Sequence, residues 1–136
     1  MKPRVVLDTN ILLDLFYFQD IRVQALYASL KNQKIIAYTC EAIWQEFEDV
    51  LQRPTFDRSP AEIAILRAEN AAYFEWYTPE KNSSGIKCID PDDQIFIELS
   101  VEIAPCLLIT KDKDLLRLKK RLEKVQVQTL KEFPLE

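Results

Sequence analysis

The sequence of 136 residues contains no histidine, and this absence excludes several kinds of enzyme site. Neither a Ser-His-Asp triad nor a Cys-His pair can form without an imidazole. Zinc sites that use histidine ligands are excluded for the same reason. The catalytic groups that remain are carboxylates, lysines and hydroxyls, and carboxylates without histidine suit hard cations such as magnesium or manganese.

Glycine, cysteine and long apolar runs are also scarce. A single glycine and a hydrophobic content of 48% predict a compact globular fold with few flexible linkers. The three cysteines, Cys40, Cys88 and Cys106, form no C-x-x-C pair, so we expect reduced, mostly buried thiols. No apolar run is long enough to span a bilayer and no signal-peptide pattern is present. We therefore expect one domain over residues 1–136, located in the cytoplasm.

The formal net charge of -4 does not predict a surface that attracts nucleic acid as a whole. The charge is uneven, however, because residues 111–124 hold seven basic and three acidic side chains. A solvated helix face is the ordinary explanation of such a run. An edge that binds phosphates is the alternative.

Short apolar runs alternate with stretches of helical periodicity along the chain. Strands are predicted near residues 5–7, 35–39, 106–109 and 125–128, and one more near either 76–78 or 86–89. Helices are predicted over 41–52, from Pro60 to about Trp76, from Pro91 to about 103, and from Leu115. This alternation predicts a three-layer α/β/α fold with a central, mostly parallel sheet of about five strands.

Two of the predicted strands run directly into acidic residues. Asp8 follows Val5-Val6-Leu7, and Asp112 follows the strand that ends before Thr110. In open α/β sheets, functional sites form outside the carboxyl ends of the strands. Thr9 or Asn10 is the predicted cap of the helix that follows, and the alternative for Asp8 is that it only helps in this capping.

Two helices supply further acids. Glu46 borders the apolar face of the helix over 41–52, where a carboxylate is costly unless it is paired or binds a metal. A lysine or arginine partner, or an end that reaches water, is the ordinary alternative. Asp90 is a predicted N-cap, with Asp92 and Asp93 in the first turn of the helix that follows. Capping explains each of these acids, but their crowding costs repulsion unless a cation relieves it.

At these positions the chain resembles the PIN domains, metal-dependent nucleases of which many are the toxins of VapBC-type toxin–antitoxin modules. The motifs that carry the resemblance are Val6-Leu7-Asp8-Thr9-Asn10, Glu46 within residues 41–51, Asp90-Pro91-Asp92-Asp93, and Ile109-Thr110-Lys111-Asp112-Lys113-Asp114-Leu115-Leu116. The spacing of four motifs together is specific, whereas any one of them alone is a weak signal.

The resemblance implies a set of site residues. Asp8, Glu46, Asp93 and Asp112 match the four acids of the family, Thr110 matches its site hydroxyl, and Asn10 matches its polar residue after the first acid. Asp8 and Asp93 are then the main metal ligands. Glu46 and Asp112 are ligands, directly or through water, or they orient the attacking water. Asp90 is an additional candidate ligand.

The resemblance also implies an endoribonuclease that uses Mg²⁺ or Mn²⁺, with RNA as substrate. Lys111, Lys113 and Arg117 follow the last motif and are candidates for contacts to flanking phosphates. The family usually forms homodimers and pairs with a small antitoxin protein. The apolar stretches Leu12–Phe18 and Trp76–Tyr77 are candidate contact surfaces for these partners.

Other classes of protein remain as alternatives. A haloacid-dehalogenase-type phosphatase needs a second acid two residues after the first, where Asn10 stands. A receiver domain needs an acid pair after the first strand, where this chain has Leu7-Asp8. Another magnesium-dependent phosphohydrolase and a non-catalytic, carboxylate-rich binding module are further alternatives.

Overall fold

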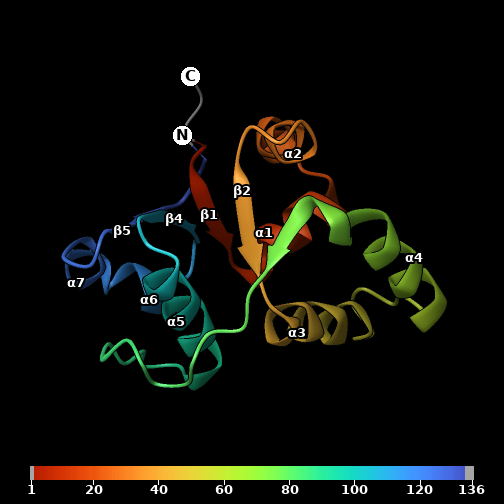
Figure 1. Cartoon of the computed structure of the whole chain (residues 1–136). Helices are drawn as coiled ribbons and strands as arrows, with labels where there is room; N and C mark the ends of the chain where they lie inside the picture. The colour runs from red at the N-terminus through yellow and green to blue at the C-terminus, as the bar shows by residue number, and fades with distance from the viewer. Residues whose placement is uncertain (1, 134–136) are drawn as a thin grey trace.

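The computed structural model describes residues 2–133, and five strands of this part of the chain form one all-parallel sheet (Figure 1). The strand order is β3-β2-β1-β4-β5. The strands are β1 (Arg4–Leu7), β2 (Ile36–Thr39), β3 (Phe74–Trp76), β4 (Cys106–Ile109) and β5 (Val127–Leu130). The predicted α/β fold with helices on both faces of a parallel sheet is therefore confirmed.

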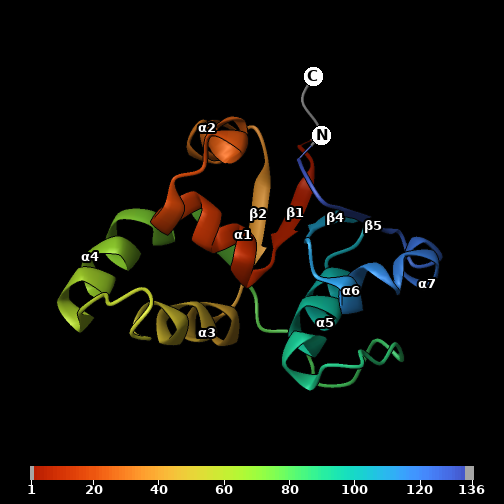
Figure 2. The same cartoon turned by 180° about the vertical axis from the view of Figure 1, so that it is seen from behind.

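Helices connect the strands and close both faces of the sheet. They are α1 (Thr9–Leu13), α2 (Gln24–Lys31), α3 (Glu41–Leu51), α4 (Pro60–Asn70), α5 (Gln94–Glu102), α6 (Lys113–Leu116) and α7 (Lys119–Glu123). A π-helical turn (Asp14–Phe18) continues α1, and short 3₁₀ turns precede α2 and α5 and follow α4. Helix α1 lies in front of the strands in Figure 2 and behind them in Figure 1, whereas α5 packs against β1 and β4.

The central position of β1 explains its composition. It pairs in parallel with β2 on one side and with β4 on the other, so both of its faces lie under other elements. Val5 and Val6 are accordingly inaccessible to solvent. In Figure 1 the arrowheads of β1 and β2 point toward α3 and α5, so the carboxyl edge of the sheet lies between these two helices.

An aromatic cluster docks α3 against the sheet. The ring of Trp44 lies 5.4 Å from that of Phe47 and 5.5 Å from that of Phe74 on β3, and Phe16 lies 6.0 Å from Trp44. Edge-to-face contacts of this kind add to the free energy of burial. Because Trp44 and Phe47 are fully buried, the rotation of α3 about its axis is fixed, and with it the direction of Glu46.

Several local predictions are confirmed. Ser59 and Glu62 form the predicted capping box at the start of α4, with Pro60 at the first helical position. The apolar residues of α3 that the periodicity selects are buried. All three cysteines are free and buried. Among the described residues, no helix has both the length and the apolar composition needed to cross a membrane.

The predicted helix from Pro60 to Trp76 is wrong in its second half. Helix α4 ends at Asn70, and Phe74–Trp76 forms β3, at the edge of the sheet. The side chain of Asn70 donates to the carbonyl of Leu66 (2.8 Å) and accepts from the hydroxyl of Tyr27 (2.9 Å). A polar side chain that bonds the carbonyl four residues back competes with the helical ladder, and pairing with β2 then favours the extended conformation.

The last strand also begins later than predicted, at Val127 rather than Val125. Gln126 has a φ of 65°, in the left-handed region, and it ends the turn that follows α7. Val125 is therefore part of that turn, and the strand takes in Thr129 and Leu130 instead.

Candidate active site

Asp8 stands at the carboxyl end of β1 and caps α1. One oxygen of its carboxylate, Oδ1, accepts a hydrogen bond from the backbone N–H of Ile11 (3.0 Å). The cap is thus Asp8 itself, and not Thr9 or Asn10, which are the first two residues of the helix. The other oxygen, Oδ2, accepts a hydrogen bond from the hydroxyl of Thr110. Since Asp8 is only 3% exposed, these partners compensate part of the cost of burying its charge.

Thr110 links Asp8 to the second strand-end acid. Strands β1 and β4 are neighbours, with Leu7 opposite Ile109, so Asp8 and Thr110 meet at the same edge of the sheet. The hydroxyl of Thr110 also accepts a hydrogen bond from the backbone N–H of Asp112 (3.0 Å). Asp112 in turn caps α6, because its Oδ1 accepts from the N–H groups of Asp114 (2.8 Å) and Leu115 (3.3 Å).

The third acidic segment reaches this edge from the start of α5. Asp90 caps the 3₁₀ turn Pro91–Asp93, accepting from the N–H of Asp92 (2.9 Å). One carboxylate oxygen each from Asp90, Asp93 and Asp114 lie within 4.8 Å of one another, a spacing that a single metal ion could bridge. Asp92 is exposed and stands outside this group.

Asp114 is the acid that the sequence analysis left out of the site. It follows Asp112 by two residues within the same motif, so the signal was present, but only one acid of that motif was assigned. In the folded chain the carboxylate of Asp112 caps α6, and Asp114 in the first turn of α6 joins Asp90 and Asp93. Asp114 also lies 3.4 Å from the guanidinium of Arg117.

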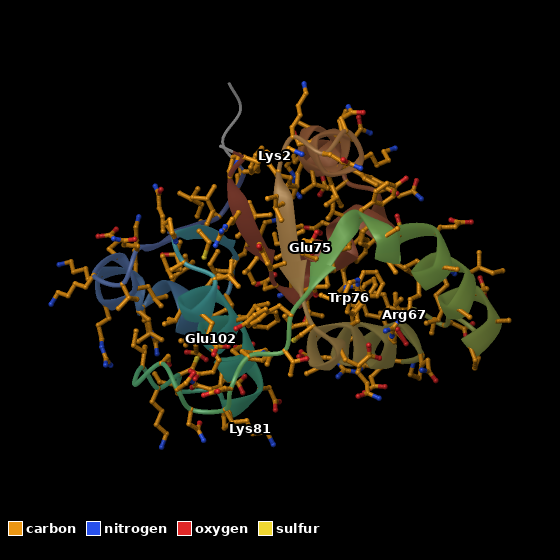
Figure 3. All side chains as sticks on the ribbon, in the orientation of Figure 1. Lys2, Arg67, Glu75, Trp76, Lys81 and Glu102 are labelled. Carbon is orange, nitrogen blue, oxygen red and sulfur yellow. The ribbon has the colours of Figure 1, made fainter. Side chains whose placement is uncertain are left out.

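Glu46 projects from the half-buried side of α3. Among the described residues it has no ion pair with lysine or arginine, so the ordinary explanation of a basic partner does not hold. The basic side chain bound to α3 is Arg67, which pairs with Glu41 and with Glu48 (3.0 Å). Glu48 is half-buried against Arg67. Arg67 also stacks on the ring of Trp76 (Figure 3).

The carboxylates influence one another most strongly at Asp93. Burial, followed by repulsion from Asp112, Asp90, Glu46 and Asp8, raises the pKa of Asp93 from its ordinary value of 3.8 to about 7. Burial also raises the pKa of Glu46 and, partly offset by the Thr110 hydrogen bond, that of Asp8. Capping explains Asp8, Asp90 and Asp112 one by one, but it does not explain why all of these charges converge.

The donor set fits a divalent cation. Every candidate ligand is a carboxylate oxygen, the ligand that hard cations prefer. The Oδ2 atom of Asp93 is buried and lacks a hydrogen-bond partner among the described residues. A positive charge next to this oxygen would satisfy it and relieve the repulsion between the acids.

The remaining candidate residues lie at the rim. Asn10 is exposed on α1. Lys111 is exposed and its ammonium group pairs with Asp14 (3.1 Å), and Lys113 and Arg117 are exposed on and after α6. Of these three candidate phosphate contacts, Arg117 reaches an acid of the cluster, because its guanidinium lies 3.4 Å from Asp114.

A comparison of the sequence with known families gives one match. Residues 4–114 match the family profile described as PIN domain. The matched segment begins with β1 and ends at Asp114, so it contains every acid of the cluster and leaves out α7 and β5. No curated protein matched the chain.

Removing one charge of the cluster should stabilise the metal-free protein. In Asp93→Asn the amide replaces a carboxylate whose pKa is raised to about 7, so repulsion is lost and shape is kept. The folded state holds the Asp93 proton more tightly than the unfolded state does. The penalty is therefore absent below about pH 4 and grows as the pH rises to 7. We expect Asp93→Asn to melt higher than wild type in EDTA at pH 8, by about 3 °C per ~1 kcal/mol of relief.

Melting curves at pH 5 and pH 8, each with EDTA and with magnesium, measure this effect. The gain should be smaller at pH 5, and magnesium should raise the melting point of wild type more than that of the variant. Asp49→Asn is the matched control, because Asp49 is an exposed acid on α3, and its melting point should change less. A variant Asp93→Asn that melts lower in EDTA at pH 8 would show that Asp93 serves only the helix start.

Proposed function

This chain belongs to the PIN-domain family, and we propose that it is a divalent-metal-dependent endoribonuclease, the toxin component of a type II toxin–antitoxin pair. PIN domains are in general metal-dependent nucleases, so hydrolysis of nucleic acid is the activity that the family supports. The observation that carries the choice of site is the convergence of Asp8, Glu46, Asp90 and Asp112 on Asp93 without a basic partner for any of them among the described residues.

The proposed division of labour follows the contacts. Asp8 and Asp93 are the main ligands of the cation, and Asp90 and Asp114 complete its acidic surroundings. When bound, the cation supplies an activated water and stabilises the departing oxyanion of the phosphodiester. Thr110 donates to one oxygen of Asp8 and thereby fixes the orientation of that carboxylate.

We assign Glu46 and Asp112 to the cation or to its water. Each is among the charges that raise the pKa of Asp93, and we assign each to bind the cation directly or through a water molecule. Glu46 comes from α3, which the aromatic cluster fixes, and its carboxylate is not engaged in an ion pair with another described residue. We assign it to orienting the attacking water by accepting a hydrogen bond from it.

RNA is itself an anion, so the acidic cluster should repel it in the absence of the cation. Lys111, Lys113 and Arg117 offer positive charge on the adjacent surface, and we assign them to the phosphates that flank the scissile bond. Such contacts position the strand without reading its sequence. Binding should therefore weaken as the salt concentration rises.

The proposal includes a homodimer and a small antitoxin partner, expected from the family. Of the two stretches expected to form contacts, Leu12–Phe18 is largely unsuited, because Leu12, Leu13, Leu15 and Phe16 are buried in the core. Phe18, Trp76 and Tyr77 are exposed by 57%, 37% and 43%.

Sedimentation equilibrium tests the dimer, and a monomer at all workable concentrations would contradict it. Arrest of bacterial growth on induced expression tests the toxin assignment.

Cleavage of RNA should require magnesium or manganese and stop in excess EDTA. The reason is that Asp8, Glu46, Asp90, Asp93 and Asp112 have no basic partner among the described residues, so a cation is needed both to bind RNA and to activate water. The measurement is gel analysis of single-stranded RNA incubated with each ion, with EDTA, and with the ion restored after EDTA. Unchanged cleavage in EDTA would refute the metal mechanism. Metal binding without any cleavage would instead favour the carboxylate-rich binding module.

The variant Asp8→Asn should lose cleavage while its circular dichroism spectrum stays native. The amide keeps the size of the carboxylate and can still accept from Ile11 or Thr110, but it removes the charge that we assign to the cation. Asp49→Asn is the matched control, since Asp49 is an exposed acid on α3, and it should cleave RNA as wild type does. Activity of Asp8→Asn close to that of wild type would remove Asp8 from the site.

A further inference from the structure

A buried carboxylate that the proposed mechanism does not use lies on α5. Glu98 is 3% exposed, and it forms no ion pair with another described residue. Its Oε1 accepts from the backbone N–H of Ser84 (2.9 Å) and from the hydroxyl of Ser83 (3.4 Å). Its Oε2 accepts from the hydroxyl of Ser84 and from the side-chain amide of Gln94 (2.8 Å). Burial acts to raise the pKa of Glu98, but these hydrogen bonds outweigh it and hold the pKa below its usual value.

Gln94 extends this network to the segment before the site. Its Nε2 donates to the carbonyl of Ile86 (2.7 Å) as well as to Glu98, and its Oε1 accepts from the backbone N–H of Cys88 (2.7 Å). An ionised carboxylate only accepts hydrogen bonds, so Glu98 requires Gln94 to present its NH₂ group to it. The oxygen of the Gln94 amide must then point the other way, toward the N–H of Cys88.

The bond between Cys88 and Gln94 closes a short loop around the site acids. Asp90 follows Cys88 by two residues, and Asp93 directly precedes Gln94. Residues 77–90, which connect β3 to the 3₁₀ turn before α5, form neither helix nor strand (Figure 1). The 3₁₀ turn fixes the spacing between Asp90 and Asp93, because the N–H of Asp93 donates to the carbonyl of Asp90 (3.1 Å). The segment that leads into this turn is held instead by side chains of α5, through the contacts of Gln94 and Glu98.

We propose that Glu98 is a positioning residue of the candidate site. Through Ser84 and Gln94 it fixes the loop that carries Asp90 and Asp93, and it thereby sets the affinity of the site for a divalent cation. This inference rests on the proposed function, because it requires that Asp90 and Asp93 bind the cation. Glu98 itself stays away from cation and RNA.

Glu98→Ala should weaken the binding of Mn²⁺ about tenfold or more, the usual effect of removing a group that orients metal ligands. Cleavage should fall at limiting Mn²⁺ and recover at saturating Mn²⁺, with KM for RNA little changed. Glu102→Ala is the matched control. Glu102 lies on the same helix (Figure 3), and its carboxylate accepts a hydrogen bond from the N–H of Glu80 (3.0 Å) in the segment between β3 and α5. Glu80 precedes Asp90 by ten residues, so this contact is far from the site acids along the chain. Its affinity for Mn²⁺ should equal that of wild type.

The Mn²⁺ dissociation constants are measured by electron paramagnetic resonance, well below the melting point of each variant. Ser84→Ala is the second variant, because it removes the hydroxyl that donates to Glu98 and keeps the carboxylate. It should also weaken the binding of Mn²⁺. If Glu98→Ala fails to fold, the result for Ser84→Ala decides whether the positioning role holds. Wild-type affinity in a folded Glu98→Ala, or in Ser84→Ala, overturns the positioning role. Failure of wild type to bind Mn²⁺ overturns instead the proposed function on which it rests.

Discussion

The hydrogen bond from Thr110 to Asp8 is the contact on which the geometry of the candidate site depends. It joins the carboxyl ends of the two central strands, β1 and β4, and it partly compensates a carboxylate that is almost fully buried. The hydroxyl of Thr110 also accepts a hydrogen bond from the backbone N–H of Asp112. Because Asp112 caps α6, this contact also positions Asp114 in the first turn of that helix. The register of β1 against β4 therefore determines the positions of Asp8, Asp112 and Asp114 together. A shift between these two strands would separate Asp8 from the other two acids.

The sequence predicted the parts of the fold that local pattern determines. Buried runs such as Cys106–Ile109 are apolar because both faces of a central parallel strand are covered, and capping residues such as Ser59 bond within their own helix. Of the two positions predicted for one further strand, the structure has β3 close to the first, at Phe74–Trp76. Its bounds escaped prediction because this segment is extended through pairing with β2, a partner distant in sequence. The predicted start of β5 at Val125 is too early for another reason, because the left-handed turn at Gln126 contains no glycine that would mark it in the sequence.

The same division applies to the site. Asp8, Glu46, Asp93 and Asp112 could be named from motif and position, and the fold brings them near one another around Asp93. Asp114 was left out because the sequence does not show which carboxylate of the Asp112–Asp114 pair is used in capping. Glu98 was not singled out, because apart from Gln94 its partners are a backbone amide and hydroxyls of an irregular segment. Such contacts have no periodicity that a sequence could reveal.

The distance along the chain between Asp8 and Thr110 also determines when the site can exist. Residue 8 is made before its partner strand β4, which comes about a hundred residues later in the chain. Contacts between segments so far apart form late, since a long loop must close first. A chain still on the ribosome, with β4 inside the exit tunnel, therefore lacks the assembled cluster. The order of the strands thus means that the carboxylates of this PIN domain converge only after β4 has left the exit tunnel.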